Sequence, residues 1–301
     1  MGELPPPVIY FLQQVVNGLQ LGFVYALIAL GYTMVYGIVR LINFAHGDVF
    51  MVGAFVGFFA VTVLQLPFVA AILLAMFVCM VLGVTIERLA YKPLRNAPKI
   101  AALITAIGMS LFLEYFSSLK FVFGPDYRQF PRPFDVTIWD IGGVGISNIL
   151  VIILVVSLVL VVGLQYIVTR TKVGIAMRAA SFDNDTARLM GINVDFVISV
   201  TFAIGSALAG AGGVLFAIAY PQINPFMGIM PGLKAFVAAV LGGIGIIPGA
   251  LLGSLIMGQA EVLTTGYVSS TLRDAVAFGI LILVLLIRPS GILGKSGIEK
   301  V

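Results

Sequence analysis

The chain has 301 residues, of which 60% are hydrophobic and only 10% are charged. Soluble domains carry about 25% charged residues, so this composition excludes an ordinary soluble protein and indicates a polytopic membrane protein. The net charge of +4 does not favour nucleic acid as a partner, because the basic residues are scattered between apolar runs instead of forming one stripe.

Apolar runs long enough to cross about 30 Å of hydrocarbon recur along the whole sequence. The runs lack the alternation of strands, and a bilayer offers backbone groups no outside partner, so each run is predicted to be a helix. We therefore expect an all-α polytopic membrane protein with a single transmembrane domain over residues 1–301. The predicted crossings, about eight helices with broken or re-entrant segments, are 8–36, 47–65, 67–88, 100–120, 146–168, 194–219, 233–264 (interrupted) and 270–288.

The first polar interruption is residues 37–51, GIVRLINFAHGDVFM, which contain Arg40, Asn43, His46 and Asp48. Glycines at both ends indicate a break between two helices. Asn43 or Asp48 can cap the helix that follows, and Arg40 can serve as a cytoplasmic charge or pair with Asp48. The break is either a cytoplasmic turn or a deep segment whose Asn43, His46 and Asp48 form part of a cavity floor or gate.

Glu114 is the most deeply placed acid of the predicted helices. Acids inside a membrane are functional candidates because burying a charge is costly. Alternatively, the side chain reaches the outer surface or pairs with Lys120.

The sequence predicts no enzyme. It contains one histidine and one cysteine, His46 and Cys79, which is too few for a nucleophile pair with an orienting group or for a metal site of three or four ligands. We expect no catalytic residue, no metal site and no cofactor in this chain.

A polar connection at 169–193 includes AMRAASFDNDTARLM, residues 176–190, which predicts one short amphipathic helix that stops at Gly191. Small apolar residues and Met190 can form one shallow face, with arginines and aspartates elsewhere. Such a helix is either an ordinary surface connector or a docking element for a soluble subunit.

Basic residues predict the orientation, since cytoplasmic loops retain lysine and arginine. Twelve of the 17 fall on one side if Arg40, the loops 87–99 and 169–193 and the tail from Arg288 are cytoplasmic. The N-terminus is then outside and the C-terminus cytoplasmic, which requires two crossings within 233–264. Gly242, Gly243 and Gly245 begin the break between them, either a cytoplasmic hairpin turn or a deep re-entrant bend.

Several long runs resemble the LivH-type permease family of high-affinity branched-chain amino acid ABC importers, and the similarity covers essentially the whole chain. These runs are LGYTMVYGIVRLINFAHGDVFMVGAF (30–55), ERLAYKPLR (87–95), LITAIGMSLFL (103–113), GIAMRAASFDNDTARLMGIN (174–193), NPFMGIMPGLKAFVAAVLGGIGIIPGALLG (224–253) and LILVLLIRPSGILG (281–294).

The resemblance implies an ABC importer permease fold in the bacterial cytoplasmic (inner) membrane. It implies four partners: a second homologous permease, two cytoplasmic ABC ATPases that use ATP and Mg, and an extracytoplasmic amino-acid-binding protein. The loop 169–193 would couple to the ATPases. By matching positions, the coupling residues are Arg178, Ala179, Ala180, Asp183, Asn184, Ala187, Arg188 and Gly191.

In this family reading, the candidates for the translocation path or a gate are Asn43, His46, Asp48, Glu114, Gly242, Gly243 and Gly245. Lys234 and Asp274 are expected at the outer mouth, as solvated charges or as contacts of the binding protein. Gln222 and Asn224 either line that mouth or serve turn chemistry.

Other functions stay open at this stage. Related permeases carry urea, short amides or other amino acids. An ion-coupled secondary transporter could use His46, Asp48 or Glu114 as proton sites, but ionisable groups inside the predicted spans are sparse.

Overall fold

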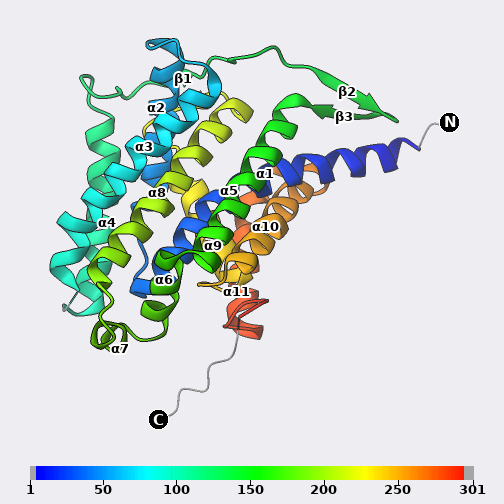
Figure 1. Cartoon of the computed structure of the whole chain (residues 1–301). Coiled ribbons are helices and arrows are strands. Elements are labelled where there is room, and N and C mark those ends of the chain that lie inside the picture. Colours follow the sequence, from blue (N-terminus) through cyan, green and yellow to red (C-terminus); the bar gives the residue numbers. More distant parts are fainter. Residues whose placement is uncertain (1–4, 96, 295–301) are drawn as a thin grey trace.

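The computed structural model describes residues 5–95 and 97–294, and these form one helical bundle (Figure 1). Within those residues, seven helices are long and apolar enough to cross a membrane. They contain α1 (Pro6–Val39), α3 (Phe68–Ile86), α4 (Lys99–Ser117), α5 (Asn148–Arg170), α8 (Val194–Ala219), α10 (Ile247–Tyr267) and α11 (Arg273–Ile287). The span of α3 continues to Leu94, and that of α11 begins with the 3-10 turn η3 (Ser270–Leu272). Two shorter apolar helices, α2 (His46–Thr62) and α9 (Ile229–Gly242), complete the predicted set, so the membrane-spanning fold expected from the apolar runs is confirmed.

The two ends of the bundle differ. One end carries α6 (Lys172–Phe182) and α7 (Asn184–Leu189), and we call it the α6/α7 end. The other, the hairpin end, carries β2 (Ile138–Ile141) and β3 (Val144–Ser147), which pair antiparallel near the N-terminus (Figure 1). Two further short strands, β1 (Arg128–Gln129) and β4 (Gln222–Ile223), also pair antiparallel. The all-α expectation omitted these four strands, which lie in loops beyond the long helices.

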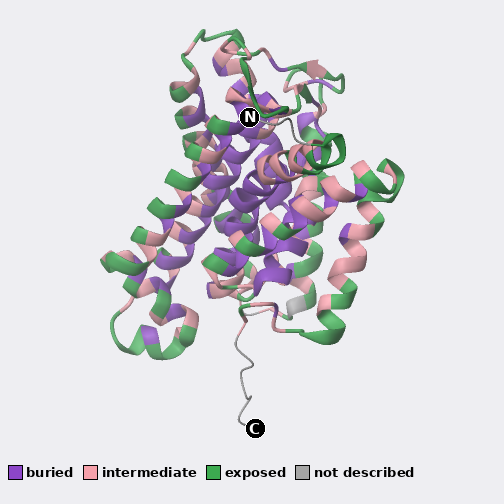
Figure 2. Ribbon diagram, turned by 90° about the vertical axis from the view of Figure 1, so that its right-hand side faces the viewer, coloured by how far each residue is buried: buried purple, intermediate pink, exposed green. Residues whose placement is uncertain are grey.

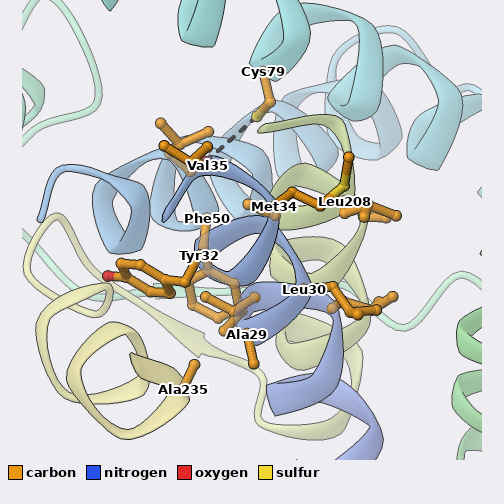
Figure 3. Packing of buried hydrophobic residues seen from close by; sticks show 14 of the residues in the cluster. Ala29, Leu30, Tyr32, Met34, Val35, Phe50, Cys79, Leu208 and Ala235 are labelled. Atoms are coloured by element: carbon orange, nitrogen blue, oxygen red, sulfur yellow. Dashed lines mark hydrogen bonds between the residues drawn. The ribbon is translucent and has the colours of Figure 1, made fainter. Parts of the chain in front are cut away.

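The centre of the bundle is formed by α1 and α8, while α11 lies at its edge. In the most apolar window of each helix, 83% of α1 and 72% of α8 are buried, against 6% of α11. Figure 2 shows the same gradient from buried centre to exposed periphery. Large apolar side chains fill the spaces around α1 (Figure 3), and Cys79 on α3 donates a hydrogen bond to the carbonyl of Val49 on α2. The exposed apolar faces of the peripheral helices are suited to contact with lipid or with another subunit.

Close helix crossings depend on glycine. A Cβ atom built on Gly53 of α2 would lie 2.5 Å from the Cα atom of Gly210 on α8. Glycines at this crossing let the backbones of α2 and α8 lie closer together than larger side chains would allow, as is common in membrane helix bundles.

The connection after α3 is not a free loop. The π-helix η1 (Glu87–Tyr91) and the 3-10 helix η2 (Lys92–Leu94) continue α3 directly. π-Helical turns are rare and are often found at functional sites.

The predicted break within 233–264 is a hairpin turn between α9 and α10, so this stretch does contain two helices. Gly243 and Gly245 have φ values of 107° and 92°, which glycine adopts readily. Gly245 lies beside Gly37, close to the end of α1, and lines the same small pocket as Arg178 and Ser181 of α6. The turn therefore lies near the α6/α7 end, and the deep re-entrant alternative is wrong.

The break after α1 differs, because it carries the chain back into the bundle. α1 ends at Val39 and α2 begins at His46, whose ring lies against Gly31. Gly31 in turn packs on Gly205, near the middle of the 26-residue helix α8. α2 therefore begins about halfway along the bundle, given about 1.5 Å of rise per helical residue, and the deep alternative describes this segment.

Candidate functional site

His46 is a buried histidine in the middle of the bundle. Its ring packs edge-on against Tyr32 with 4.8 Å between ring centroids, and its exposed fraction is 1%. Among the described residues Nε2 has no hydrogen-bond partner. An unpaired polar atom at such a position is uncommon in folded proteins, which makes His46 a candidate functional residue.

Two buried acids, Asp48 of α2 and Glu114 of α4, lie between these two helices. The hydroxyl of Ser110 donates to Oδ2 of Asp48 over 2.5 Å, and the carboxyl of Glu114 is within hydrogen-bonding reach of Asp48. Both acids are buried. Glu114 therefore faces α2 rather than Lys120, and two of the predicted path residues, Asp48 and Glu114, come together.

Asn43 has a different partner from the one expected. Neither Asn43 nor Asp48 caps α2, because the N-cap residue is Ala45 and no side chain bonds there. Instead, the hydroxyl of Tyr91 in η1 donates to Oδ1 of Asn43 over 2.9 Å. Arg40 is exposed at the end of α1 and does not reach Asp48. We call residues 40–48, which return the chain into the bundle after α1, the re-entrant segment. This segment is thus joined to η1 by a hydrogen bond between two residues that are 48 positions apart.

The predicted coupling segment 176–190 forms two helices, not one. Asp183 interrupts it with an extended backbone, φ −156° and ψ 115°. Its carboxylate accepts hydrogen bonds from the amide of Asp185 (2.9 Å) and the hydroxyl of Thr186 (2.5 Å), and so caps α7. These bonds keep the pKa of Asp183 below its usual range. The helix is interrupted because the side chain of Asp183 caps α7, although the residues on both sides of it favour a continuous helix.

The apolar face exposed by α6 and α7 is only partly the expected one. Ala180 and Ala187 are buried against the bundle. We define the docking patch as the three large apolar side chains that are most exposed at this end: Phe182 (89%), Leu189 (88%) and Met190 (79%). The predicted face correctly included Met190, but it also included Ala180 and Ala187, which are buried, and it lacked Phe182.

The other coupling residues lie on or beside this surface. Arg178 donates to the carbonyl of Val168, at the end of α5. Gly191 has a φ of 84° and allows the turn from α7 into α8, as expected. Ala179 and Asn184 are half-buried.

An ion-pair network, which was not predicted from the sequence, connects α7 with η1 and α8. Asp195 in α8 accepts from Nη1 of Arg95 over 2.5 Å and lies 3.7 Å from Nη2 of Arg188 in α7. Arg95 also pairs with Glu87 in η1. The hydroxyl of Ser199 donates to Oε2 of Glu87 over 2.7 Å. Glu87 is fully buried, so this network is a structural joint rather than a solvated charge run.

Of the two charges expected at the outer mouth, Lys234 is buried and Asp274 is 37% exposed. Lys234 is 2% exposed and Glu261 4%, at the hairpin end. Their burial depends on partners far away in the sequence, which explains why solvated loop charges seemed the simpler interpretation of the sequence.

Lys295 and Lys300, counted among the cytoplasmic basic residues, lie outside the described residues.

Comparison with known proteins gives a consistent result. The family model described as "Branched-chain amino acid transport system / permease component" matches residues 14–285. The high-affinity branched-chain amino acid transport system permease protein LivH of Escherichia coli (strain K12) is 45% identical over 97% of this chain and 98% of its own. The corresponding permease protein BraD of Pseudomonas aeruginosa is 44% identical over 98% and 100%. Of solved structures, PsaBC from Streptococcus pneumoniae in complex with Fab matches with a TM-score of 0.49 and 15% identity, over 93% of this chain and 92% of that one.

Proposed function

The chain belongs to the family of branched-chain amino acid transport permeases, and we propose that it carries leucine, isoleucine, valine or a related hydrophobic amino acid into a bacterial cell. The observation that carries this proposal is identity of 44–45% over nearly the full length of relatives with that named function. The chain is a membrane-spanning permease subunit, not an enzyme.

The transporter is proposed to contain this permease, a second homologous permease, two cytoplasmic ABC ATPases and an extracytoplasmic amino-acid-binding protein. The ATPases supply the chemistry of ATP and Mg. The α6/α7 end then faces the cytoplasm and the hairpin end faces outwards, in the inner membrane of the cell. The excess of lysine and arginine in the loops of the α6/α7 end supports this orientation.

The ATPases are proposed to bind the docking patch. Phe182, Leu189 and Met190 are large, apolar and exposed beyond the ends of the long helices. Exposed apolar surface of this kind favours a protein partner. The neighbouring Arg188 adds a charge that can select an acidic partner surface.

Movement of the docking patch is proposed to reach the membrane centre through η1. Arg188 of α7 lies beside Asp195, Asp195 pairs with Arg95, and Arg95 pairs with Glu87 at the start of η1. The last residue of η1, Tyr91, donates to Asn43.

The re-entrant segment is therefore the proposed gate, with Asn43, His46, Asp48 and Glu114 as its polar residues. A displaced segment would change which side of the membrane the cavity meets, as in other alternating-access transporters. Gly242, Gly243 and Gly245 are proposed to support the cytoplasmic end of the path.

The proposal is tested by reconstituting the permease with its copurifying ATPases and binding protein in vesicles. ATP-dependent accumulation of labelled leucine, but not of urea or a charged amino acid, is expected. Accumulation of urea alone would replace the substrate, and uptake that stops with a collapsed proton gradient at constant ATP would indicate secondary transport instead.

A further inference from the structure

A cavity of about 330 Å³ opens at the hairpin end, within the ~300–1,000 Å³ typical of small-molecule sites. Its wall is shared by α1, α8, α9, α10, α11 and the segment that contains β4. Several elements that are distant in sequence therefore meet around one space, as ligand sites require.

One wall of the cavity is charged, and two of its charged side chains, Lys234 and Glu261, are buried. Nζ of Lys234 lies 2.7 Å from Oε1 of Glu261 and 2.7 Å from Oδ1 of Asp274. Nε of Arg273 lies 3.2 Å from the same oxygen of Glu261. The hydroxyl of Tyr25 donates to Oε2 of Glu261 over 2.8 Å. Two cations and two anions are thus gathered at one place, with no net charge.

Three side chains of the charged wall can be reached by a ligand in the cavity. Lys234, Glu261 and Arg273 all line the cavity. The side chain of Arg273 is 49% exposed, so its guanidinium can receive a further partner. A planar guanidinium binds a carboxylate through two parallel hydrogen bonds.

The facing wall is apolar. It is formed by Leu21, Phe216, Met227, Met230 and Pro231. Methionines adapt to apolar groups of different shape. The amide side chains of Gln222 and Asn224 complete the rim and supply oxygen acceptors.

We propose that this cavity binds a free α-amino acid with an apolar side chain. The carboxylate of the ligand pairs with Arg273, its ammonium group pairs with Glu261 and the amide oxygens of the rim, and its side chain contacts the methionines and Phe216. This inference rests on the proposed function and places a substrate-recognition site in the permease itself, in addition to the one in the binding protein.

Burying the charges of this wall costs desolvation free energy, and this cost supports a binding role over a purely structural one. The attraction within a buried ion pair offsets its desolvation penalty only when the geometry is good. Well-packed apolar residues in the same place often give a protein of equal or higher stability. Here the ion pairs line an open cavity instead of a closed core. A neutral, zwitterionic ligand adds one charge of each sign and leaves the cluster balanced.

A thiol at the cavity tests the location of the site. Met230 lines the cavity and is 45% exposed, and Cys79 is fully buried. In the purified transporter carrying Met230→Cys, alkylation by a small maleimide should slow about tenfold or more in excess L-leucine, since an occupied site is blocked. Tyr127→Cys, exposed at the same end but outside the cavity, should react equally with and without leucine.

Ligand analogues and a second variant test the chemistry. L-Leucinamide lacks the carboxylate and 4-methylpentanoate lacks the ammonium group, and neither should protect the introduced thiol at the concentration at which leucine does. Arg273→Gln should weaken direct binding of labelled leucine to the transporter, measured without the binding protein, about tenfold or more. Arg273→Lys should lose less, because it keeps the charge.

The outcomes separate this site from the proposed function. Leucine uptake by a transporter whose introduced thiol is not protected, and whose binding is unchanged by Arg273→Gln, overturns the site and leaves the function intact. Protection by leucine in an assembly that does not accumulate leucine keeps the site and overturns the proposed function. If Met230→Cys fails to fold, the binding measurement on the native chain and Arg273→Gln decides alone.

Discussion

The imidazole of His46 occupies the space in which a side chain at Gly31 would lie. A Cβ atom built on Gly31 would be 2.1 Å from Nε2 of His46. Gly31 packs on Gly205, near the middle of α8. The absence of a side chain at Gly31 is therefore what allows His46 to lie so deep in the bundle. Glycine at 31 and histidine at 46 therefore act as one structural unit.

Gly31→Ala should destabilise the permease, because inserting atoms into a packed core typically costs about 1–3 kcal/mol. The double variant with His46→Ala should recover part of this loss, since the two residues contact each other and their effects are not additive. Thermal unfolding of the purified protein measures both. Gly163→Ala is the control, as nothing lies within 4 Å of a Cβ there. Equal losses in the single and double variants would show that the histidine does not fill this space.

The long helices could be predicted from the sequence because each depends on local information. An uninterrupted apolar run of sufficient length must be helical in a bilayer, and the predicted crossing 194–219 coincides with α8. The two helices within 233–264 followed from the charge bias and the cluster of glycines, features that need no tertiary contact.

The depth of a side chain in the bundle and the partners of the buried charges could not be predicted from the sequence, because both depend on contacts between residues far apart in the chain. The deep position of His46 results from Gly31 and Gly205, and the burial of Lys234 from Glu261 and Asp274. The division of the coupling segment at Asp183 is local, but an aspartate inside a run of good helix formers fits a continuous helix as well as a cap.

Arg95 and Lys92 both pair with Asp195, yet removing them should have very different effects. Arg95→Gln leaves Glu87, which is fully buried, without its cation, and breaking a buried pair costs roughly 3–5 kcal/mol. Lys92 and Asp195 are 52% and 44% exposed, and exposed pairs contribute about 0–1 kcal/mol. Thermal unfolding of Arg95→Gln beside Lys92→Gln measures the difference. Similar melting temperatures would mean that Glu87 has another partner.

Tyr91→Phe removes the hydrogen bond that joins η1 to Asn43. The variant should keep its ATPases but transport fewer amino acids for each ATP hydrolysed, because the proposed mechanical link to the re-entrant segment is cut. Leaving the buried Asn43 oxygen unpaired should also cost about 1–3 kcal/mol. Uptake and ATP hydrolysis measured in the same vesicles test the coupling. Tyr166→Phe, on the exposed face of α5, should change neither; an unchanged ratio in Tyr91→Phe would remove η1 from the mechanism.

The cap of α7 should respond to pH in a known direction. The pKa of Asp183 is lowered by bonds from Thr186 and the amides of α7, so its carboxylate stabilises the helix above the unfolded pKa of about 3.9. That stabilisation is lost as the pH falls through the folded pKa, and α7 should be constant from about pH 5 upwards. Hydrogen exchange at the amide of Asp185 measures the cap. Asp183→Ala should speed exchange at neutral pH and abolish its dependence on acid, whereas Asp183→Asn should retain the cap.

Leu189→Arg and Ala187→Arg should both stop uptake, for different reasons. Leu189 belongs to the docking patch and is 88% exposed, so an arginine there should leave the melting temperature of the permease unchanged while the ATPases no longer copurify. Ala187 faces the bundle and is 4% exposed, so the same substitution must displace α7 or bury an unpaired charge. Ala187→Arg should therefore lower the melting temperature as well, and Ala180→Arg should behave in the same way.

Phe121→Arg is the matched control, because Phe121 is 79% exposed in the loop after α4, away from the α6/α7 end. It should leave both stability and the copurification of the ATPases unchanged. If Leu189→Arg instead retains its ATPases, the exposed apolar residues at the α6/α7 end do not form their binding surface. The buried alanines would then influence uptake only through the packing of α6 and α7 against the bundle.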